Sequence, residues 1–188
     1  MRILITGTTG GIGGAVARAA ASAGDDVVAV NRPEWEQLAA ILDGPQPFEA
    51  VVFATGECRV KPLTQTMDDD FADAMRVNCG LFLRLMRELV TRQLSAEQGM
   101  KVVALSSVSA VEGWPGGALY CASKGALSAL CRALDAELKP RKISVKALEP
   151  RYVRTRMFES CAGRMGVPAA LAEDPAVLAE RILNELKS

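Results

Sequence analysis

The sequence contains no histidine among its 188 residues. Histidine is the commonest metal ligand and general base in proteins, so its absence argues against a zinc site and against a Ser-His catalytic triad. We therefore expect no bound metal. Any proton transfer near neutral pH must use a side chain of another kind.

The chain also lacks net charge and long apolar runs. Basic and acidic residues number 22 each, so no field favours nucleic acid or an anionic membrane. Apolar runs stay under about ten residues, whereas roughly 20 are needed to span a bilayer. The start, Met1 to Ile5, leads into a glycine-rich turn rather than a signal peptide. We expect no nucleic-acid or membrane partner, and a cytoplasmic setting.

Cysteine is present but forms no recognisable framework. The number of cysteines is odd and no two of them form a Cys-x-x-Cys motif, which is typical of reduced thiols. The five are Cys58, Cys79, Cys121, Cys131 and Cys161.

Short apolar runs alternate with helix-forming stretches along the chain. The expected strands are 2–6, 26–31, 49–55, 101–106 and 143–148, and the expected helices are 12–23, 34–42, 68–94, 117–138 and 175–186. This alternation predicts an α/β fold, a Rossmann-like doubly wound parallel sheet with helices on both faces. A chain of this length buries roughly 70% of its unfolded surface, enough for one core, so we expect a single dinucleotide-binding domain over residues 1–188.

A glycine-dense turn from Gly7 to Gly14 separates the first strand from an alanine-rich helix. Glycine lets the backbone approach a pyrophosphate closely, and the free N–H groups and dipole at a helix start favour its negative charge. A flexible surface loop is the alternative interpretation. The strand directly before and the helix directly after favour phosphate binding.

Tyr120 and Lys124 are four residues apart, so both project from one face of the expected helix 117–138. A neighbouring cation stabilises phenolate, and Lys124 is therefore expected to lower the pKa of Tyr120 from roughly 10 toward working pH. Ser107 ends an apolar run and is expected at the carboxyl end of a buried strand, where open α/β sheets bind ligands. Each feature alone is common on ordinary helices and turns, and only the joint spacing indicates acid–base chemistry.

Taken together, these motifs resemble the short-chain dehydrogenase/reductase family, in the branch with Thr-Gly-x-x-x-Gly-x-Gly and Tyr-x-x-x-Lys. The resemblance runs from residue 1 to about residue 155. It implies an NAD(P)-dependent oxidoreductase that transfers hydride between nicotinamide and a small-molecule carbonyl or secondary alcohol. The matching positions are Thr6, Gly7, Gly11 and Gly13 in the turn, and Asn78, Ser107, Tyr120 and Lys124 at the catalytic positions.

The resemblance also implies a role for each catalytic residue. Tyr120 would be the acid/base, Lys124 would lower its pKa and anchor the nicotinamide ribose, and Ser107 would hydrogen-bond the substrate oxygen. Asn78 would hold a relay water. The expected cofactor contacts are Gly7, Thr9, Gly11, Ile12, Gly13, Asn31, Arg32, Gly56, Tyr120, Lys124 and Thr155.

The end of the second expected strand bears on cofactor preference. NAD-specific members place a carboxylate at the position of Asn31, where it repels a 2′-phosphate. That repulsion is absent here, and Arg32 beside it can pair with the phosphate, so NADP is favoured while NAD stays open. Arg32 as an ordinary solvated residue is the alternative.

Several positions depart from the family pattern. Arg151 replaces a glycine near the nicotinamide pocket, and the Asn-Asn-Ala-Gly segment is represented only by Gly56, with loss of a polar brace. The region between Val30 and Phe48 is shorter than usual, and the family's last strand has no counterpart. The chain is thus a trimmed member by this resemblance. These departures keep open a catalytically inactive, dinucleotide-binding or regulatory protein.

Two further features concern the substrate and the oligomeric state. The segment after Thr155 would set substrate identity, with Met157, Phe158 and Met165 as apolar contacts or as ordinary packing. Helix 117–138 is apolar on several faces, and relatives in the family dimerise there, so a homodimer is expected. Burial within one subunit is the alternative. An epimerase sharing Tyr-x-x-x-Lys would need a larger substrate domain than 188 residues provide.

Overall fold

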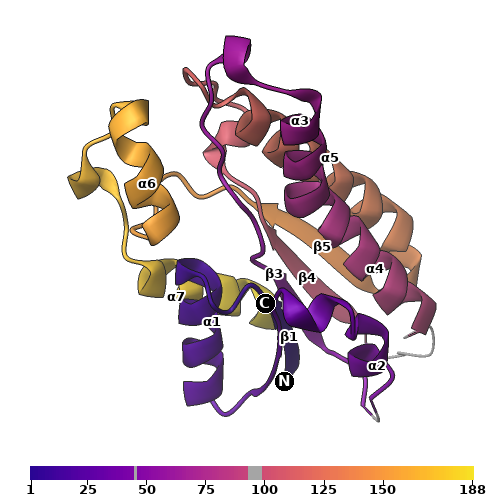
Figure 1. The fold of residues 1–188 in the computed structure, drawn as a ribbon. Helices are drawn as coiled ribbons and strands as arrows, with labels where there is room; N and C mark the ends of the chain where they lie inside the picture. The colour runs from indigo at the N-terminus through magenta and orange to yellow at the C-terminus, as the bar shows by residue number, and fades with distance from the viewer. Residues whose placement is uncertain (45, 93–98) are drawn as a thin grey trace.

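The computed structural model describes residues 1–44, 46–92 and 99–188. Its centre is a sheet of five parallel strands in the order β2-β1-β3-β4-β5 (Figure 1). The parallel sheet with helices on both faces confirms the predicted fold class. The strands are β1 (Arg2–Thr6), β2 (Asp26–Val30), β3 (Ala50–Phe53), β4 (Met100–Leu105) and β5 (Ile143–Leu148).

Helices form a layer on each side of the sheet. Figure 1 shows α1 and α7 on one side and α2, α4 and α5 on the other, in agreement with the two buried apolar clusters. The α-helices are α1 (Gly11–Ser22), α2 (Leu38–Leu42), α3 (Asp68–Met75), α4 (Leu81–Arg92), α5 (Ala118–Leu138), α6 (Arg156–Met165) and α7 (Pro175–Lys187). Short helical turns are η1 (Pro33–Trp35), η2 (Leu63–Gln65), η3 (Arg76–Gly80), η4 (Val108–Ala110), η5 (Lys139–Arg141) and η6 (Ala169–Leu171).

Each strand supplies side chains to both layers of the core, because successive residues of a strand point to opposite faces. In β1, Ile3 and Ile5 pack with α1 and α7, whereas Leu4 packs with α2, α4 and α5. All three are completely buried. Burial on both faces explains why the strands are unbroken apolar runs in the sequence.

The strand order reverses between β1 and β3, since β2 lies on one side of β1 and β3 to β5 follow on the other. At such a reversal a crevice opens beyond the carboxyl ends of the strands. Thr6, at the end of β1, is fully buried there. Its Oγ1 accepts hydrogen bonds from the N–H groups of Ala54 and Thr55 at 3.1 and 3.2 Å and from Thr55 Oγ1 at 2.9 Å. The segment after β3 therefore keeps a polar brace, contrary to our expectation.

Three helical segments differ from the prediction. The expected helix 34–42 is a 3-10 turn followed by α2, and Gln37 N–H bonds Glu34 C=O, three residues back. The expected helix 68–94 is divided into α3 and α4 by a π-turn at Arg76–Gly80, and its residues 93 and 94 lie outside the described residues. The helix α6 was not predicted, because its ten residues are a short stretch of mixed polar and apolar composition.

None of the helices in residues 1–44, 46–92 and 99–188 combines the length and the apolar character needed to cross a membrane. The longest, α5, contains lysine, arginine, aspartate and glutamate.

The glycine turn is packed tightly beneath the start of α1. Gly7 has φ of +70° and its N–H donates to Val30 C=O at 3.0 Å, which joins the turn to the end of β2. A Cβ atom added to Gly13 would lie 2.3 Å from Gly7 O and 3.2 Å from Ala54 Cβ. Only glycine lets α1 approach the sheet this closely, so the turn and the helix start have one relative position.

We predict that Gly13→Ala destabilises the fold by about 1–3 kcal/mol, because the added methyl overlaps backbone that cannot move freely. Gly163→Ala in α6 is the matched control, since a Cβ there meets nothing within 4 Å and replacing helical glycine stabilises by up to about 1 kcal/mol. Urea denaturation followed by circular dichroism gives both free energies of unfolding. A Gly13→Ala protein as stable as the wild type would contradict this packing.

Candidate active site

The predicted catalytic residues meet beyond the carboxyl end of β4. Ser107 follows β4 and is buried, and its Oγ accepts a hydrogen bond from Ser109 N–H at 3.1 Å. The preceding Ser106 donates from Oγ to Lys124 C=O at 3.0 Å, which joins β4 to α5. A third hydroxyl, Ser128 Oγ, donates to Ser106 Oγ at 2.8 Å. This buried hydroxyl network holds α5 in register with the strand end.

Helix α5 presents Tyr120 and Lys124 on one face, as their spacing predicts. The Lys124 ammonium lies 5.7 Å from the centre of the Tyr120 ring, and Lys124 Nζ donates to Leu105 C=O at 2.7 Å. Tyr120 and Ser107 line the same cavity, and the Ser107 hydroxyl acts to lower the pKa of the Tyr120 phenol. A phenol, a hydroxyl and an ammonium are thus gathered at one strand end.

The expected lowering of the Tyr120 pKa is wrong. Burial raises the pKa of Tyr120 well above its ordinary value, because phenolate loses more hydration than phenol does. The nearby Ser107 hydroxyl acts in the opposite direction and is the weaker effect. Lys124 does not reverse this shift, since its ammonium lies near the ring and donates to a backbone carbonyl. Tyr120 is therefore protonated at neutral pH.

Lys124 is only 5% exposed. Burial lowers the pKa of Lys124 from 10.5 to about 8, since an ammonium is poorly solvated there. The side chain is accordingly still charged for the most part at neutral pH. Its neighbourhood also includes Gly56, where an added Cβ would lie 3.3 Å from Lys124 Nζ.

Asn78 is completely buried in the π-turn between α3 and α4. Its Oδ1 accepts from Glu57 N–H at 2.8 Å, and its Nδ2 donates to Glu57 C=O and Ser123 Oγ, both at 2.9 Å. Both amide hydrogens are therefore used within the protein. Asn78 braces the segment after β3 against α5, and the insertion of a π-turn aims its side chain there.

The glycine turn leaves a helix start available for a phosphate. Gly10, the residue before α1, offers no side-chain cap to the first N–H groups of the helix, which include Gly11, Ile12 and Gly13. Their N–H groups and the helix dipole favour an anion. The residues of the expected phosphate site thus suit a pyrophosphate.

Asn31 and Arg32 follow β2 but behave differently. The Asn31 amide accepts from Thr9 N–H at 3.3 Å and exchanges hydrogen bonds with Thr8 Oγ1 at 3.0 and 3.2 Å. Asn31 therefore holds the glycine turn. Arg32 is exposed at the rim. Of these two residues, Arg32 is the exposed cation beside the turn; Arg18 of α1 is also exposed and lies beside it, with Nη1 3.4 Å from a Cβ added to Gly14.

Thr155 joins the segment after β5 to the glycine turn. Its Oγ1 caps α6 by accepting from Phe158 N–H at 3.2 Å. A Cβ added to Gly11 would lie 2.5 Å from Thr155 Cγ2, which shows how closely the two segments approach. The predicted residues of the cofactor site are therefore contiguous from α1 to α6.

Arg151, which replaces a glycine of the family pattern, adopts no left-handed backbone; Lys142 is the one non-glycine residue with positive φ in the described part of the chain. The Arg151 guanidinium turns outward and forms an ion pair with Glu112 at 2.6 Å. Because this position does not require glycine geometry, the replacement leaves the local backbone undistorted.

A cavity of about 90 Å³ lies between Tyr120 and α6. Sequence reasoning did not identify four of its lining residues: Cys58, Trp114, Tyr152 and Cys161. A tryptophan within the glycine-rich stretch before α5 was a usable signal, and Trp114 donates to Ser109 Oγ at 3.1 Å. Tyr152 stacks with Phe158 at 5.8 Å between ring centres. The wall facing the Ser107 and Tyr120 hydroxyls is therefore largely apolar.

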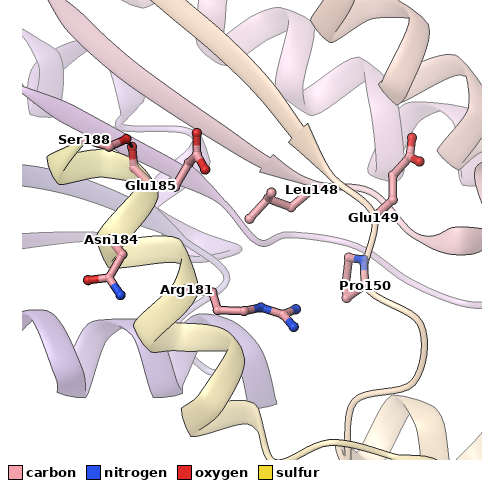
Figure 2. A pocket seen from close by; sticks show the side chains of 7 residues that line it. All are labelled: Leu148, Glu149, Pro150, Arg181, Asn184, Glu185 and Ser188. Carbon is pink, nitrogen blue, oxygen red and sulfur yellow. Dashed lines mark hydrogen bonds between the residues drawn. The ribbon is translucent and has the colours of Figure 1, made fainter.

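A second cavity, of about 580 Å³, lies between the end of β5 and α7 (Figure 2). Its charged side chains already have partners: Arg181 pairs with Glu173 at 3.1 Å, and Glu185 pairs with Lys146 at 2.7 Å. It shares only the segment around Pro150 with the cavity over Tyr120. Within the described residues, no three His, Cys, Asp or Glu side chains are grouped to hold a metal ion.

Known proteins resemble this chain in both sequence and fold. The 3-oxoacyl-(acyl-carrier-protein) reductase of Rickettsia felis is 28% identical over 179 residues, covering 83% of this chain and 74% of its own length. The L-xylulose reductase of Bos taurus is 28% identical over 182 residues, covering 85% and 74%. A solved actinorhodin polyketide ketoreductase superposes with a TM-score of 0.84 at 20% identity, covering 98% of this chain and 89% of that one.

The sequence model of one family, described as short chain dehydrogenase, matches residues 36–165. This match covers more than half of the chain and includes Asn78, Ser107, Tyr120 and Lys124. The expected resemblance is thereby confirmed, and the chain belongs to the short-chain dehydrogenase family of NAD(P)-dependent oxidoreductases.

Proposed function

We propose that this protein reduces the carbonyl group of a small apolar molecule with NADPH, and that Tyr120 donates the proton. The observation that carries the proposal is the meeting, at one cavity, of the buried Ser107 hydroxyl, the Tyr120 phenol and the Lys124 ammonium, which lies 5.7 Å from the centre of the Tyr120 ring. This arrangement lies at the carboxyl end of β4, next to the glycine turn. Both relatives compared above are named as reductases, which supports the same class of reaction.

The chemistry of the site follows from where negative charge develops. When bound, the nicotinamide supplies a hydride to the carbonyl carbon. The carbonyl oxygen then becomes alkoxide-like, and Tyr120 Oη and Ser107 Oγ are the two hydroxyls positioned to meet it. Tyr120 transfers its proton to this oxygen, and Ser107 stabilises it by hydrogen bonding. Lys124 supplies positive charge behind the phenolate that remains.

The pKa of Tyr120 supports the reductive direction. A phenol whose pKa is raised by burial stays protonated at neutral pH, which is the form that a general acid needs. Alcohol oxidation would require the phenolate as a base, and that form is rare here until the pH is high. The protonated phenol is therefore the form of Tyr120 that is present for carbonyl reduction near neutral pH.

The rim of the glycine turn supports NADPH over NADH. No carboxylate occupies position 31, where Asn31 holds the turn, and the exposed Arg32 can pair with a 2′-phosphate, while the Glu34 carboxylate beside them accepts a hydrogen bond from Asn31 N–H at 2.9 Å. The polyketide ketoreductase of the same fold is described with NADPH bound. The side chains at this rim and the comparison with the ketoreductase both favour NADPH as the cofactor.

One observation favours a second function, an inactive dinucleotide-binding or regulatory protein. The cavity over Tyr120 measures about 90 Å³, whereas ligand pockets commonly measure about 300–1,000 Å³. A protein that only senses the dinucleotide would need no larger cavity. Binding of NADPH without turnover of any carbonyl compound would support this alternative.

The expected homodimer through α5 and the single-domain organisation also stay predictions.

We predict that Tyr120→Phe lowers kcat for carbonyl reduction by about 10²–10⁴-fold, because it removes the proton donor and keeps the ring. The dissociation constant for NADPH, measured by its fluorescence, should change little. The chain has one other tyrosine, and Tyr152→Phe is the matched control, since Tyr152 lines the same cavity and its ring packs against Phe158. Equal losses of kcat in both variants would count against Tyr120 as the acid.

A second prediction concerns the buried charge of Lys124. Its pKa is about 8 in the folded state and 10.5 in the reference state, so the unfolded chain holds the extra proton between these pH values. Stability of the wild type relative to Lys124→Met should therefore rise across this window, by roughly 3 kcal/mol in total. Urea denaturation between pH 7 and pH 11 measures the difference. Parallel stability curves would show that Lys124 is not a buried charge.

A third prediction tests the phosphate contact. Arg32→Glu should raise the dissociation constant of NADPH by about 10–100-fold, since it replaces a charge-assisted bond with repulsion, and should leave NADH binding nearly unchanged. Arg132→Glu, an exposed residue on α5, makes the same change in charge far from the turn. If both variants weaken NADPH binding equally, the effect is one of net charge and Arg32 makes no contact.

A further inference from the structure

Two cysteines from distant parts of the chain meet at the wall of the catalytic cavity. Cys58 lies in the segment after β3, and Cys161 lies on α6, 103 residues further along. Their Sγ atoms are 3.2 Å apart. Both side chains line the same cavity as Tyr120. Catalysis by Tyr120 and Ser107 gives neither thiol a role.

Among the described residues, this pair is the one contact between cysteine sulfurs. Its surroundings hold both thiols in place. The segment after β3 is held in place by Asn78, which bonds both backbone groups of Glu57. Cys161 is 4% exposed on the inner side of α6. The sulfurs need to approach by only about 1 Å to reach the bond length of a disulfide, roughly 2.05 Å.

We propose that Cys58 and Cys161 are an oxidation site, and that a peroxide converts them into a disulfide that fastens α6 over the catalytic cavity. The formation of the bond is independent of what the enzyme reduces. Its effect on turnover rests on the reductase function proposed above.

The reaction is balanced with hydrogen peroxide as the oxidant. The first thiolate attacks the peroxide O–O bond, which breaks to give a sulfenic acid on that sulfur and, with a proton, water. The second thiolate attacks the sulfenic sulfur, forms the S–S bond and releases hydroxide, which a proton converts to water. In sum, two thiols and one peroxide give one disulfide and two waters, and two electrons pass from sulfur to oxygen.

Access and charge decide which thiol reacts first. Cys58 is partly exposed to the cavity, whereas Cys161 is buried, so the peroxide reaches Cys58 first. Burial raises the pKa of the Cys58 thiol, and the Lys124 ammonium partly opposes this shift. Because the thiolate is the reactive form, the rate of oxidation should increase with pH. The pair therefore responds to sustained exposure to oxidant.

Fastening α6 would stop turnover because this helix must move for a substrate to enter. The cavity of about 90 Å³ is smaller than an ordinary ketone with its neighbouring nicotinamide requires. Around the cavity α6 is held by noncovalent contacts, among them the Thr155 cap and the Tyr152–Phe158 stack. Such contacts can open and close, whereas a covalent bond from Cys58 to Cys161 cannot.

The test uses the full chain, reduced and then treated with hydrogen peroxide, with free thiols blocked by alkylation before digestion. Before alkylation, the intact mass should be lower than that of the reduced protein by two hydrogen atoms. Alkylation should then modify only three of the five cysteines. Peptide mapping should join the Cys58 and Cys161 peptides. Cys58→Ser and Cys161→Ser should each prevent this crosslink, and Cys121→Ser, which removes another partly exposed thiol, should not.

Activity supplies the second measurement, as the ratio of turnover before and after oxidation within each protein. The wild type and Cys121→Ser should lose at least about tenfold and regain activity with dithiothreitol, while the ratio for Cys58→Ser and Cys161→Ser should stay near one. A crosslink to any other cysteine, or five alkylated cysteines after peroxide, would overturn the proposal. A crosslink that leaves turnover unchanged would overturn the closing of α6. A protein that turns over no carbonyl compound but forms the crosslink would overturn the reductase function alone.

Discussion

The site depends on one buried charge, the Lys124 ammonium against the carboxyl end of β4. A lysine in an apolar interior loses hydration, which is why its pKa falls to about 8. Its bond to Leu105 C=O replaces part of that hydration and orients the ammonium behind the Tyr120 ring. A helix with other residues at these positions would pack as well without such a penalty. The fold therefore retains a local instability where the chemistry is expected, as preorganised sites do.

The sheet provides the geometry that makes this charge useful. Reversal of strand order between β1 and β3 opens the crevice above both strand ends. Thr6 joins these ends, and Asn78 holds the following segment against α5, so the glycine turn and Lys124 have fixed relative positions. These polar braces are buried and satisfied, and such networks permit few alternative arrangements. The shortened stretch between β2 and β3 leaves this part of the crevice intact.

The pattern of neighbouring residues was sufficient to predict the strands and the shared face of α5, because these features depend on residues close together in the sequence. The apolar runs gave the five strands to within two residues at each end, and the spacing of Tyr120 and Lys124 placed both on one face of α5. The Tyr120 pKa was predicted in the wrong direction, because burial depends on segments from three strand ends that the sequence does not bring together. The Thr6 brace and the Cys58–Cys161 contact join residues 48 or more positions apart. No periodicity encodes such contacts.

The thiol of Cys58 near Lys124 affects the charge of the Lys124 ammonium. A carboxylate at Cys58 would form an ion pair with the ammonium and withdraw it from the phenol and from a bound ribose. Burial raises the pKa of Cys58, so a neutral thiol stands there at physiological pH and the ammonium stays uncompensated. A thiol of this kind is also oxidisable, whereas serine or alanine would be inert. The residue that preserves the charge of Lys124 is thus also the residue through which an oxidant can reach α6.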